Sequence, residues 1–581
     1  DIQEWLNTFS VPKQGGNEFS GTVFRLPLRN EKTSLESDIS SEIFTYKDFL
    51  KWCDDWRSGA ENLLFLRHIH RLVLQEIDAN GKLITHLEIS TENHEEIKGI
   101  NDSIQNEFTG TLIDICNHWK SHNNNLPLFK YFHIFNITCL DRNSQSYQTS
   151  QEKWAVVNGL FRGESNSLIN QAIKVLEISP HLRKVLPWAG AAVALDENDK
   201  PLKQKKNQFY TFLPLMESTY PVHIHGWFDL DSKRTMITAN GSGYTQETLI
   251  KWNQELMKDA AGNAWALLID FIKDDNCLND FYSFWAKGLD NHRTLDKCLI
   301  EGFYKTISSL ECLYAEDKNE KKWLKPSETI YIFQSRGNKV LLEALKEDFK
   351  IINPVPTKYM VDNFAAVGIE LGEITPELIR NTIKKESTGI DFPVDLLDVP
   401  ILMIANRLWF IEVFQYCADE GKDYTKVNNL PLELTLEDTL YLVGENTLFD
   451  ENPELELFQN GKHLFLDFEL TKIIANIAPA LLPVTWLEAN FKNTISTLVA
   501  NFDDIKLDKE WIEYFITFVS KASVEEINDS FDDIRTLKTV YTDDGRYKCL
   551  ESKVEDDSPV IIKSEDTSNI KYFRMTGMNL V

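Results

Sequence analysis

The length of this chain is incompatible with a single hydrophobic core. It has 581 residues, whereas single cores stop growing at about 250–300 residues. The sequence therefore predicts roughly two to four domains. Its 43% of hydrophobic and 26% of charged residues are typical of a globular protein and not of a disordered one.

The charge balance restricts the partners of the chain. Aspartate and glutamate together number 89, against 61 lysines and arginines, which gives a net charge of −28. A negative field repels the phosphates of nucleic acids and of anionic lipids, so we expect no nucleic acid as the main partner. The main basic cluster is interpreted as a solvated loop; it consists of Lys200, Lys203, Lys205 and Lys206.

The cysteines and the hydropathy pattern favour a cytoplasmic location. The eight cysteines are scattered, without a Cys-x-x-Cys pair, which is typical of reduced thiols and not of a disulfide scaffold or a zinc site. The longest apolar stretch, Leu396–Cys417, is interrupted by Asp398 and Pro400, so it predicts a buried helix and no membrane insertion. Because the first residue is Asp1, we expect a longer polypeptide of which this chain is a part.

The first 150 residues mix strands and helices. Residues 19–28 predict a strand. Residues 41–56 carry aromatic residues at helical spacing, with Thr45 as the N-cap and Asp48 three residues later. Residues 64–77 and 82–89 flank Asn80-Gly81, a dipeptide that favours a tight hairpin turn.

The next segment is richer in strands and ends in a long helix. Strands are predicted within residues 154–157, 191–195, 209–213 and 222–228. A helix with its apolar residues near one face is predicted over Thr245–Ile272. Gly241-Ser242-Gly243 precedes it; backbone N–H groups there could hold an anion, although a plain connecting turn is the simpler interpretation.

From about residue 278 onward the pattern is mainly helical. One helix has a clear start at Thr375-Pro376-Glu377, with a cap, a proline and an early acid. Residues 432–443 and 537–550 each predict a short β-hairpin with an acidic turn. The fold class predicted is therefore α+β, with a mixed sheet-and-helix region followed by a mainly helical C-terminal region that contains short β-hairpins.

Motifs of self-sufficient enzymes are missing from the sequence, which lacks a P-loop, a dinucleotide-binding glycine motif, a nucleophile elbow and a zinc-protease motif. Two His-x-His pairs, His68/His70 and His223/His225, would each place two imidazoles on one face of a strand. Since no cysteine or carboxylate cluster completes either set, we interpret them as ordinary strand histidines and expect no metal site.

The stretch from Phe209 to Arg234 is the most distinctive one. Two predicted strands are followed by the charged turn Asp231-Ser232-Lys233-Arg234. A cation fixed at the end of a rigid strand is well placed to meet a phosphate, supplied by the same chain or by another domain. The alternative is a solvated turn whose cations pair with its own aspartates.

Several of these segments resemble sacsin-type proteins. The resemblance rests on Gly21-Thr22-Val23-Phe24-Arg25-Leu26-Pro27-Leu28-Arg29, Phe212-Leu213-Pro214-Leu215, Pro221 to Phe228, Asp231 to Arg234, and in part on Trp252-Asn253 with Leu256 and Asp259. Order and spacing are maintained over residues 19–271. Asn429-Leu430-Pro431-Leu432 and the hairpin at Asp544-Gly545 are similar to later segments of the family more loosely.

The resemblance implies a nucleotide-dependent parent protein. Sacsin repeats begin with a GHKL (Bergerat-fold) ATPase domain akin to that of heat-shock protein 90, and Gly21 and Thr22 would help to bind the adenine end of ATP. The rest of that site would precede Asp1, so ATP and Mg²⁺ are expected in the full-length parent and no cofactor in this chain alone. In the middle domain of that chaperone, a basic residue after a glycine and an Asp-Ser turn reaches the γ-phosphate. The order here looks similar, with Gly226, Asp231-Ser232 and Arg234, so the resemblance implies this role for Arg234. Lys233 is the alternative.

The resemblance also implies a division of the chain. Residues 1–30 would be the terminal strand of a truncated ATPase-like domain, 31–275 a middle-like α+β region, 276–430 a mainly helical region and 431–581 a helical region with hairpins. The function implied is coupling and contact with protein clients or with other domains of a chaperone-like ATPase; this chain alone is not expected to be an enzyme. The alternatives are part of a prokaryotic defence-type ATPase that relays recognition to an effector, and a nucleotide-independent scaffold.

Overall fold

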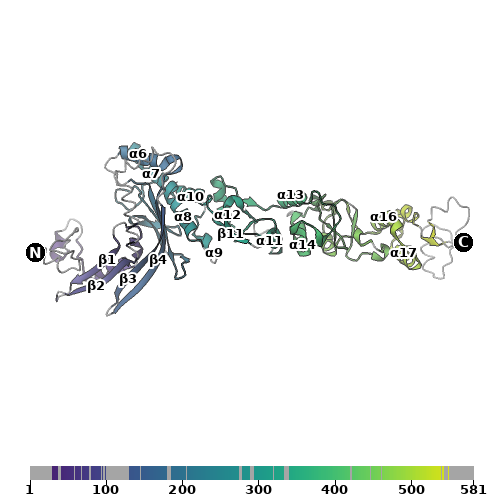
Figure 1. The fold of residues 1–581 in the computed structure, drawn as a ribbon, viewed down its shortest axis with the longest axis horizontal. Helices are drawn as coiled ribbons and strands as arrows, with labels where there is room; N and C mark the ends of the chain where they lie inside the picture. The colour runs from purple at the N-terminus through teal and green to yellow at the C-terminus, as the bar shows by residue number, and fades with distance from the viewer. Residues whose placement is uncertain are drawn as a thin grey trace. The chain divides into compact units, whose positions relative to one another are not determined.

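The chain forms two compact units in the computed structural model (Figure 1). The first comprises residues 1–314, 322–328 and 356–371, and the second residues 315–321, 329–355 and 372–581. The structure describes residues 29–36, 41–57, 59–66, 69–77, 80, 82–92, 95, 99, 130–143, 146–178, 185–204, 206–273, 278–287, 294–317, 320–332, 339–418, 422–444, 446–459, 461–537, 539–541, 547 and 548. Sheets and helices are mixed throughout, so the predicted α+β class is confirmed.

A nine-stranded sheet organises the first unit. Its order is β1-β2-β3-β4-β5-β9-β7-β8, with β6 paired to β5; the β7–β9 pair is parallel and the other pairs are antiparallel. The strands are β1 (Arg71–Ile77), β2 (Leu83–Thr91), β3 (Lys130–Asn143), β4 (Ser146–Leu160), β5 (Trp188–Leu195), β6 (Pro201–Leu202), β7 (Asn207–Thr211), β8 (Leu213–Ser218) and β9 (His223–Gly226).

Burial follows the position of each strand in this sheet. All eight residues of β5 are buried, whereas edge strand β1 has no fully buried residue. A strand covered on both faces needs apolar residues at every position, which explains the run Trp188–Leu195. Strands β1 to β4 lie side by side, and helix α8 packs against β4 and β5 (Figure 1).

Helices complete the first unit. They are α2 (Glu31–Leu35), α3 (Tyr46–Arg57), α6 (Ser167–Ile178), α7 (Tyr244–Leu256), α8 (Gly262–Phe271), α9 (Leu278–Phe281), α10 (Thr294–Ile307) and α12 (Lys358–Ala366). The cap predicted for α3 is present, since the Thr45 backbone N–H donates to Asp48 at 2.7 Å and the Asp48 N–H donates to the Thr45 hydroxyl at 3.3 Å.

The long helix predicted over residues 245–272 is confirmed with one irregularity. A π-helical turn, η3 (Met257–Ala261), joins α7 to α8 without a break. Helix α10 approaches this turn closely, because a Cβ atom on Gly302 would lie 1.8 Å from the carbonyl oxygen of Lys258. Only glycine fits at such a contact, so the two helices are held at a short, fixed separation.

Short strands and helices build the second unit. The smaller sheets that follow the large one along the chain have the orders β11-β10-β13-β12-β14, β15-β17-β16, β18-β19 and β20-β21. The strands are β10 (Leu313–Asp317), β11 (Glu320–Leu324), β12 (Ile330–Tyr331), β13 (Ile351–Ile352), β14 (Gly372–Glu373), β15 (Val394–Asp395), β16 (Glu433–Leu434), β17 (Thr439–Tyr441), β18 (Thr447–Phe449), β19 (Trp486–Glu488), β20 (Val540–Tyr541) and β21 (Tyr547–Lys548).

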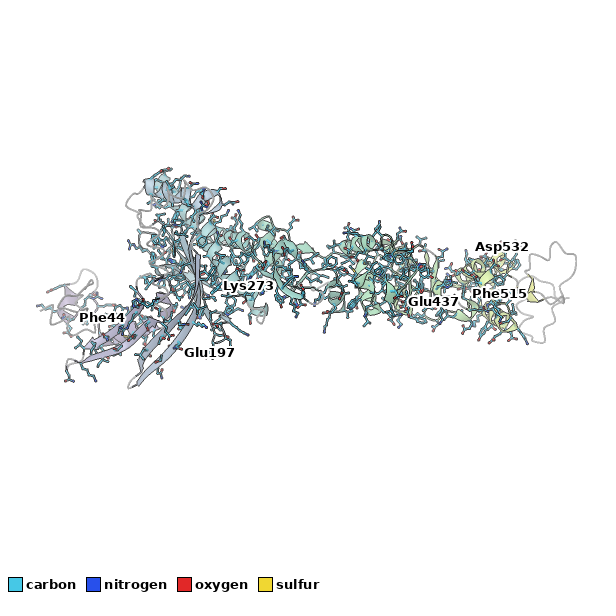
Figure 2. All side chains as sticks on the ribbon, in the orientation of Figure 1. Phe44, Glu197, Lys273, Glu437, Phe515 and Asp532 are labelled. Atoms are coloured by element: carbon cyan, nitrogen blue, oxygen red, sulfur yellow. The ribbon has the colours of Figure 1, made fainter. Side chains whose placement is uncertain are left out.

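The helices of this unit contribute to two hydrophobic clusters. One contains Phe414 and Trp486, and the other contains Trp511 and Phe515, the last of which is labelled in Figure 2. The helices are α11 (Lys339–Leu345), α13 (Pro376–Glu386), α14 (Arg407–Cys417), α15 (Phe468–Ile474), α16 (Phe491–Ala500), α17 (Lys509–Lys521), α18 (Val524–Asp529) and α19 (Phe531–Ile534). The start of α13 is as predicted, with the Thr375 hydroxyl accepting from the Leu378 N–H at 3.2 Å. Both predicted hairpins are present as β16–β17 and β20–β21.

Two local predictions are wrong. The stretch Leu396–Cys417 is helical only from Arg407 onward, because Asn406 caps α14 and residues 396–404 form two separate 3₁₀ turns. The strand predicted over residues 209–213 is broken at Phe212, whose φ of +69° reverses the chain between β7 and β8. Among the described residues, no helix is both long and apolar enough to cross a membrane.

Two histidines of β9 lie inside the large sheet. His223 and His225 are each 1% exposed. The His223 Nδ1 accepts a hydrogen bond from the Gln208 N–H at 3.1 Å, and its ring centroid lies 5.1 Å from that of Trp154. Burial lowers the pKa of His223 to about 4, so the folded protein holds this imidazole neutral.

The free energy of unfolding of a His223→Asn variant should depend less on pH in the acid range than that of the unmodified protein. The pKa of His223 in the folded protein lies below its unfolded value of 6.5. Its contribution to the free energy of unfolding is therefore complete above pH 6.5 and is lost as the pH falls toward 4, by up to about 3 kcal/mol. Asparagine retains an acceptor for Gln208 but does not titrate. Chemical unfolding of both proteins between about pH 4 and pH 7 measures the two slopes, and equal slopes would contradict the prediction.

The half-buried carboxyl of Glu61 has a pKa shifted in the opposite direction. Burial raises the pKa of Glu61 to about 7, so its contribution to stability is lost as the pH rises from 4.5 toward 7. Glu61 is present in both proteins, and its effect therefore cancels when the slopes are compared.

Candidate functional site

A buried Trp-Asn pair on α7 holds the loop that follows β9. Asn253 is fully buried. Its Oδ1 accepts from the Asp229 N–H at 2.8 Å, and its Nδ2 donates to the carbonyl oxygens of Asp229 and Thr238, both at 2.9 Å. The indole Nε1 of Trp252 donates to the Trp227 carbonyl oxygen at 3.0 Å. These bonds fix both ends of the segment from Trp227 to Thr238.

Asp231 organises the turn at the tip of this loop. Its Oδ1 accepts from the N–H groups of Thr235 at 2.7 Å and Met236 at 3.2 Å, and its Oδ2 accepts from the Thr235 hydroxyl at 3.1 Å. The pKa of Asp231 is lowered, chiefly by the backbone hydrogen bond from Thr235. The carboxylate therefore serves the backbone of its own turn.

Arg234 is presented at the surface by this turn. Its backbone N–H donates to the Asp231 carbonyl oxygen at 2.9 Å, while its side chain is exposed, as is that of Lys233. The turn is solvated, as the simpler interpretation predicted, but the Asp231 carboxylate binds backbone groups and the Thr235 hydroxyl in place of the Arg234 guanidinium. The guanidinium is thus left available for an anion.

The backbone at Arg234 is in the left-handed region, with a φ of +55°. A residue with a Cβ atom pays about 1–2 kcal/mol for this conformation, which glycine adopts freely. Such strain persists only where surrounding bonds determine the conformation, and it is concentrated at functional sites. Here the hydrogen bonds of Asp231 and Asn253 hold the backbone of the turn in this conformation.

The other candidate residues are distributed as follows. Gly21 and Thr22, together with the predicted strand 19–28, lie outside the described residues, as does His68. Ser242 donates its N–H to the side-chain oxygen of Gln246 at 3.0 Å, so the Gly-Ser-Gly segment is a turn closed by its own helix. In the described part of the chain, no three His, Cys, Asp or Glu residues come together as metal ligands would.

The hydrogen-bond partners of Asn253 and Asp259 could not be found by reasoning from motifs. Asp259 is 7% exposed and accepts hydrogen bonds from the Ser167 hydroxyl and, at 3.3 Å, from the Glu164 N–H. It thereby attaches the start of α6 to the π-helical turn. The sequence singled out Asn253 and Asp259 as part of the motif that resembles the family, but a motif does not identify the partners of a buried polar group.

An Asn253→Asp variant should loosen the basic turn. Aspartate has nearly the same shape but cannot donate to the two carbonyl oxygens, so the free energy of unfolding should fall by about 2–3 kcal/mol. Trypsin should then cleave faster after Lys233 or Arg234. Asn263→Asp is the matched control, because the Asn263 amide donates to the Asp259 carbonyl oxygen and not to the loop. Equal cleavage of the two variants at these sites would contradict the proposed role of Asn253.

Comparison with known proteins finds a family match at the start of the chain. Residues 3–88 match the model of the Sacsin domain family, a range that contains α3, β1 and most of β2. Sacsin of Homo sapiens is 29% identical over 273 residues, which cover 44% of this chain and 5% of sacsin; the chain thus spans about one twentieth of the length of that relative. No solved structure matches the chain. The family match at residues 3–88 and the identity to human sacsin show that this chain is similar to sacsin-type proteins over these parts of its length.

Proposed function

We propose that the chain couples nucleotide state to partner binding within a larger, ATP-dependent, chaperone-like protein. The observation that carries the proposal is the exposed Arg234, presented on a turn that Asn253 and Asp231 fix to the fold. A guanidinium held in place before the reaction can stabilise charge that develops on transferring phosphates without reorganising. Arg234 would therefore act on ATP bound by another domain of the parent polypeptide.

The long helix provides the route from this turn into the unit. Trp252 and Asn253 bind the loop, Asp259 binds the start of α6, and α8 packs against strands β4 and β5. Helix α10 contacts the same helix through Gly302. A displacement of the loop by nucleotide would thus be transmitted to the sheet as a rigid-body shift of packed elements.

ATP and Mg²⁺ belong to the full-length parent in this proposal. Gly21 and Thr22 would contribute to the adenine end of the nucleotide site, and Arg234, or Lys233 in its place, would contact the terminal phosphate. Free thiols are consistent with a cytoplasmic location; those that the structure describes are Cys53, Cys139, Cys298, Cys312 and Cys417. Protein clients, or other domains of the same polypeptide, are the proposed partners.

An Arg234→Ala substitution in the full-length parent should lower the turnover number for ATP by about tenfold or more, because a group that stabilises charge in the transition state is lost. Alanine also carries a Cβ atom, so the strain at a φ of +55° is retained and the turn is not relieved. Steady-state ATP hydrolysis measures the effect.

Lys233→Ala is the matched control for this experiment. It removes a neighbouring exposed cation of the same turn, and turnover should change by less than about twofold if Arg234 is the acting residue. An unchanged rate in Arg234→Ala would refute the role of Arg234. A loss confined to Lys233→Ala would transfer the role to the lysine.

A further inference from the structure

Four large apolar side chains are exposed in one region of the second unit. Leu397 is 81% exposed, Leu408 69%, Phe468 43% and Leu402 41%. We call these four residues the Leu397 patch. Single exposed apolar residues need no explanation, but a group of them marks a surface that binds a partner.

Hydrogen bonds and ion pairs bring the segments that carry Leu397, Leu408 and Phe468 together, and the 3₁₀ turn that begins at Leu402 packs against α14. Arg407 forms ion pairs with both Asp438 and Asp467. Leu408 directly follows the arginine, and Phe468 directly follows Asp467. The Leu396 N–H donates to the Asp438 carbonyl oxygen at 2.9 Å, which brings the neighbouring Leu397 to the same ion-pair network.

The patch is fixed before any partner binds. Asp467 is 1% exposed and accepts from the Glu469 N–H at 2.8 Å in addition to its ion pair. Side chains also cap the backbone of two patch residues: Asp395 accepts from the Leu397 N–H and Asn406 from the Leu408 N–H, both at 2.9 Å. A surface held in this way loses little conformational entropy on binding.

Exposed carboxylates lie on the same segments as the patch. They belong to Asp395, Asp398, Glu437, Asp438 and Glu469; Glu437 is labelled in Figure 2. The neighbouring cations are already paired, Arg407 with two aspartates and Lys472 with Glu469 at 2.7 Å. The rim therefore presents a net negative field around apolar side chains.

We propose that the Leu397 patch binds a basic amphipathic helix of a partner protein. Leucine or similar residues on one face of such a helix would cover the apolar side chains, and its lysines or arginines would meet the acidic rim. A second copy of this chain carries the same charge of −28, and an anionic membrane is negative as well, so neither complements the rim. Charge complementarity thus selects a cationic partner.

This inference rests on the partner-contacting part of the proposed function and names the chemistry of the partner. It does not involve nucleotide or Arg234. If the peptide does not bind in the absence of ATP, the patch proposal is refuted and the coupling proposal stands. If Arg234→Ala leaves the ATP turnover of the parent unchanged, the role of Arg234 is refuted and the patch proposal stands.

The probe is a fluorescent helical peptide of leucine and lysine with leucines at positions i, i+3, i+4 and i+7, titrated with the whole chain and followed by anisotropy. Saturable binding is expected. A Leu397→Ser/Leu408→Ser variant should bind about tenfold or more weakly, because two apolar contacts are lost. Both side chains are exposed, so the variant should fold normally.

Val484→Ser is the matched control, since Val484 is 87% exposed and is not part of the patch; its affinity should equal that of the unmodified chain. A peptide with glutamate in place of lysine should not bind. The proposal is overturned if the double variant binds as tightly as the unmodified chain or if the acidic peptide binds equally well. Self-association of the chain that the double variant abolishes would also overturn it, because the occupant would then be a second copy.

Discussion

The side-chain amide of Asn253 lies where one N–H group and two carbonyl oxygens of the same loop must be satisfied away from water. Its three hydrogen bonds accomplish this, and leaving such groups unpaired would cost about 1–3 kcal/mol each. An apolar side chain at position 253 could not form these hydrogen bonds. The position of the basic turn relative to α7 therefore depends on this amide together with the Trp252 indole bond, and everything proposed for Arg234 depends on that position.

The helix that carries Asn253 extends this dependence to the rest of the first unit. Its π-helical turn places Asp259 where it binds the start of α6 and brings the backbone of Lys258 against Gly302 of α10. π-helical turns within α-helices are rare and frequent at functional sites. The same helix thus positions a surface turn and two packed helices. In the second unit, Arg407 forms ion pairs with two aspartates, and the apolar side chains of the Leu397 patch are exposed on or next to the segments that these ion pairs join.

Features determined by neighbours in sequence could be predicted. The Thr45–Asp48 and Thr375 caps, the β1–β2 hairpin and the long helix all depend on residues within a few positions of one another. The two errors have local causes that propensity does not capture: a left-handed Phe212 and the cap at Asn406 that delays α14. The motif drew attention to Arg234 and its turn, and the catalytic role of Arg234 stays a prediction. The amide that holds the turn is 24 residues away from Asp229, and such a tertiary pairing cannot be found from spacing.

Amide hydrogen exchange at Asp229 and Thr238 tests the central claim most directly. The Asp229 N–H donates to Asn253, and the Thr238 N–H donates to the Asp229 carbonyl oxygen at 3.0 Å. If the loop is held as described, both amides should exchange about a hundredfold or more slowly than in an unfolded peptide, which corresponds to an opening free energy of about 3 kcal/mol. Exchange near the unfolded rate at both positions would show that the loop is not fixed, and Arg234 would then lack the preorganisation that its proposed role requires.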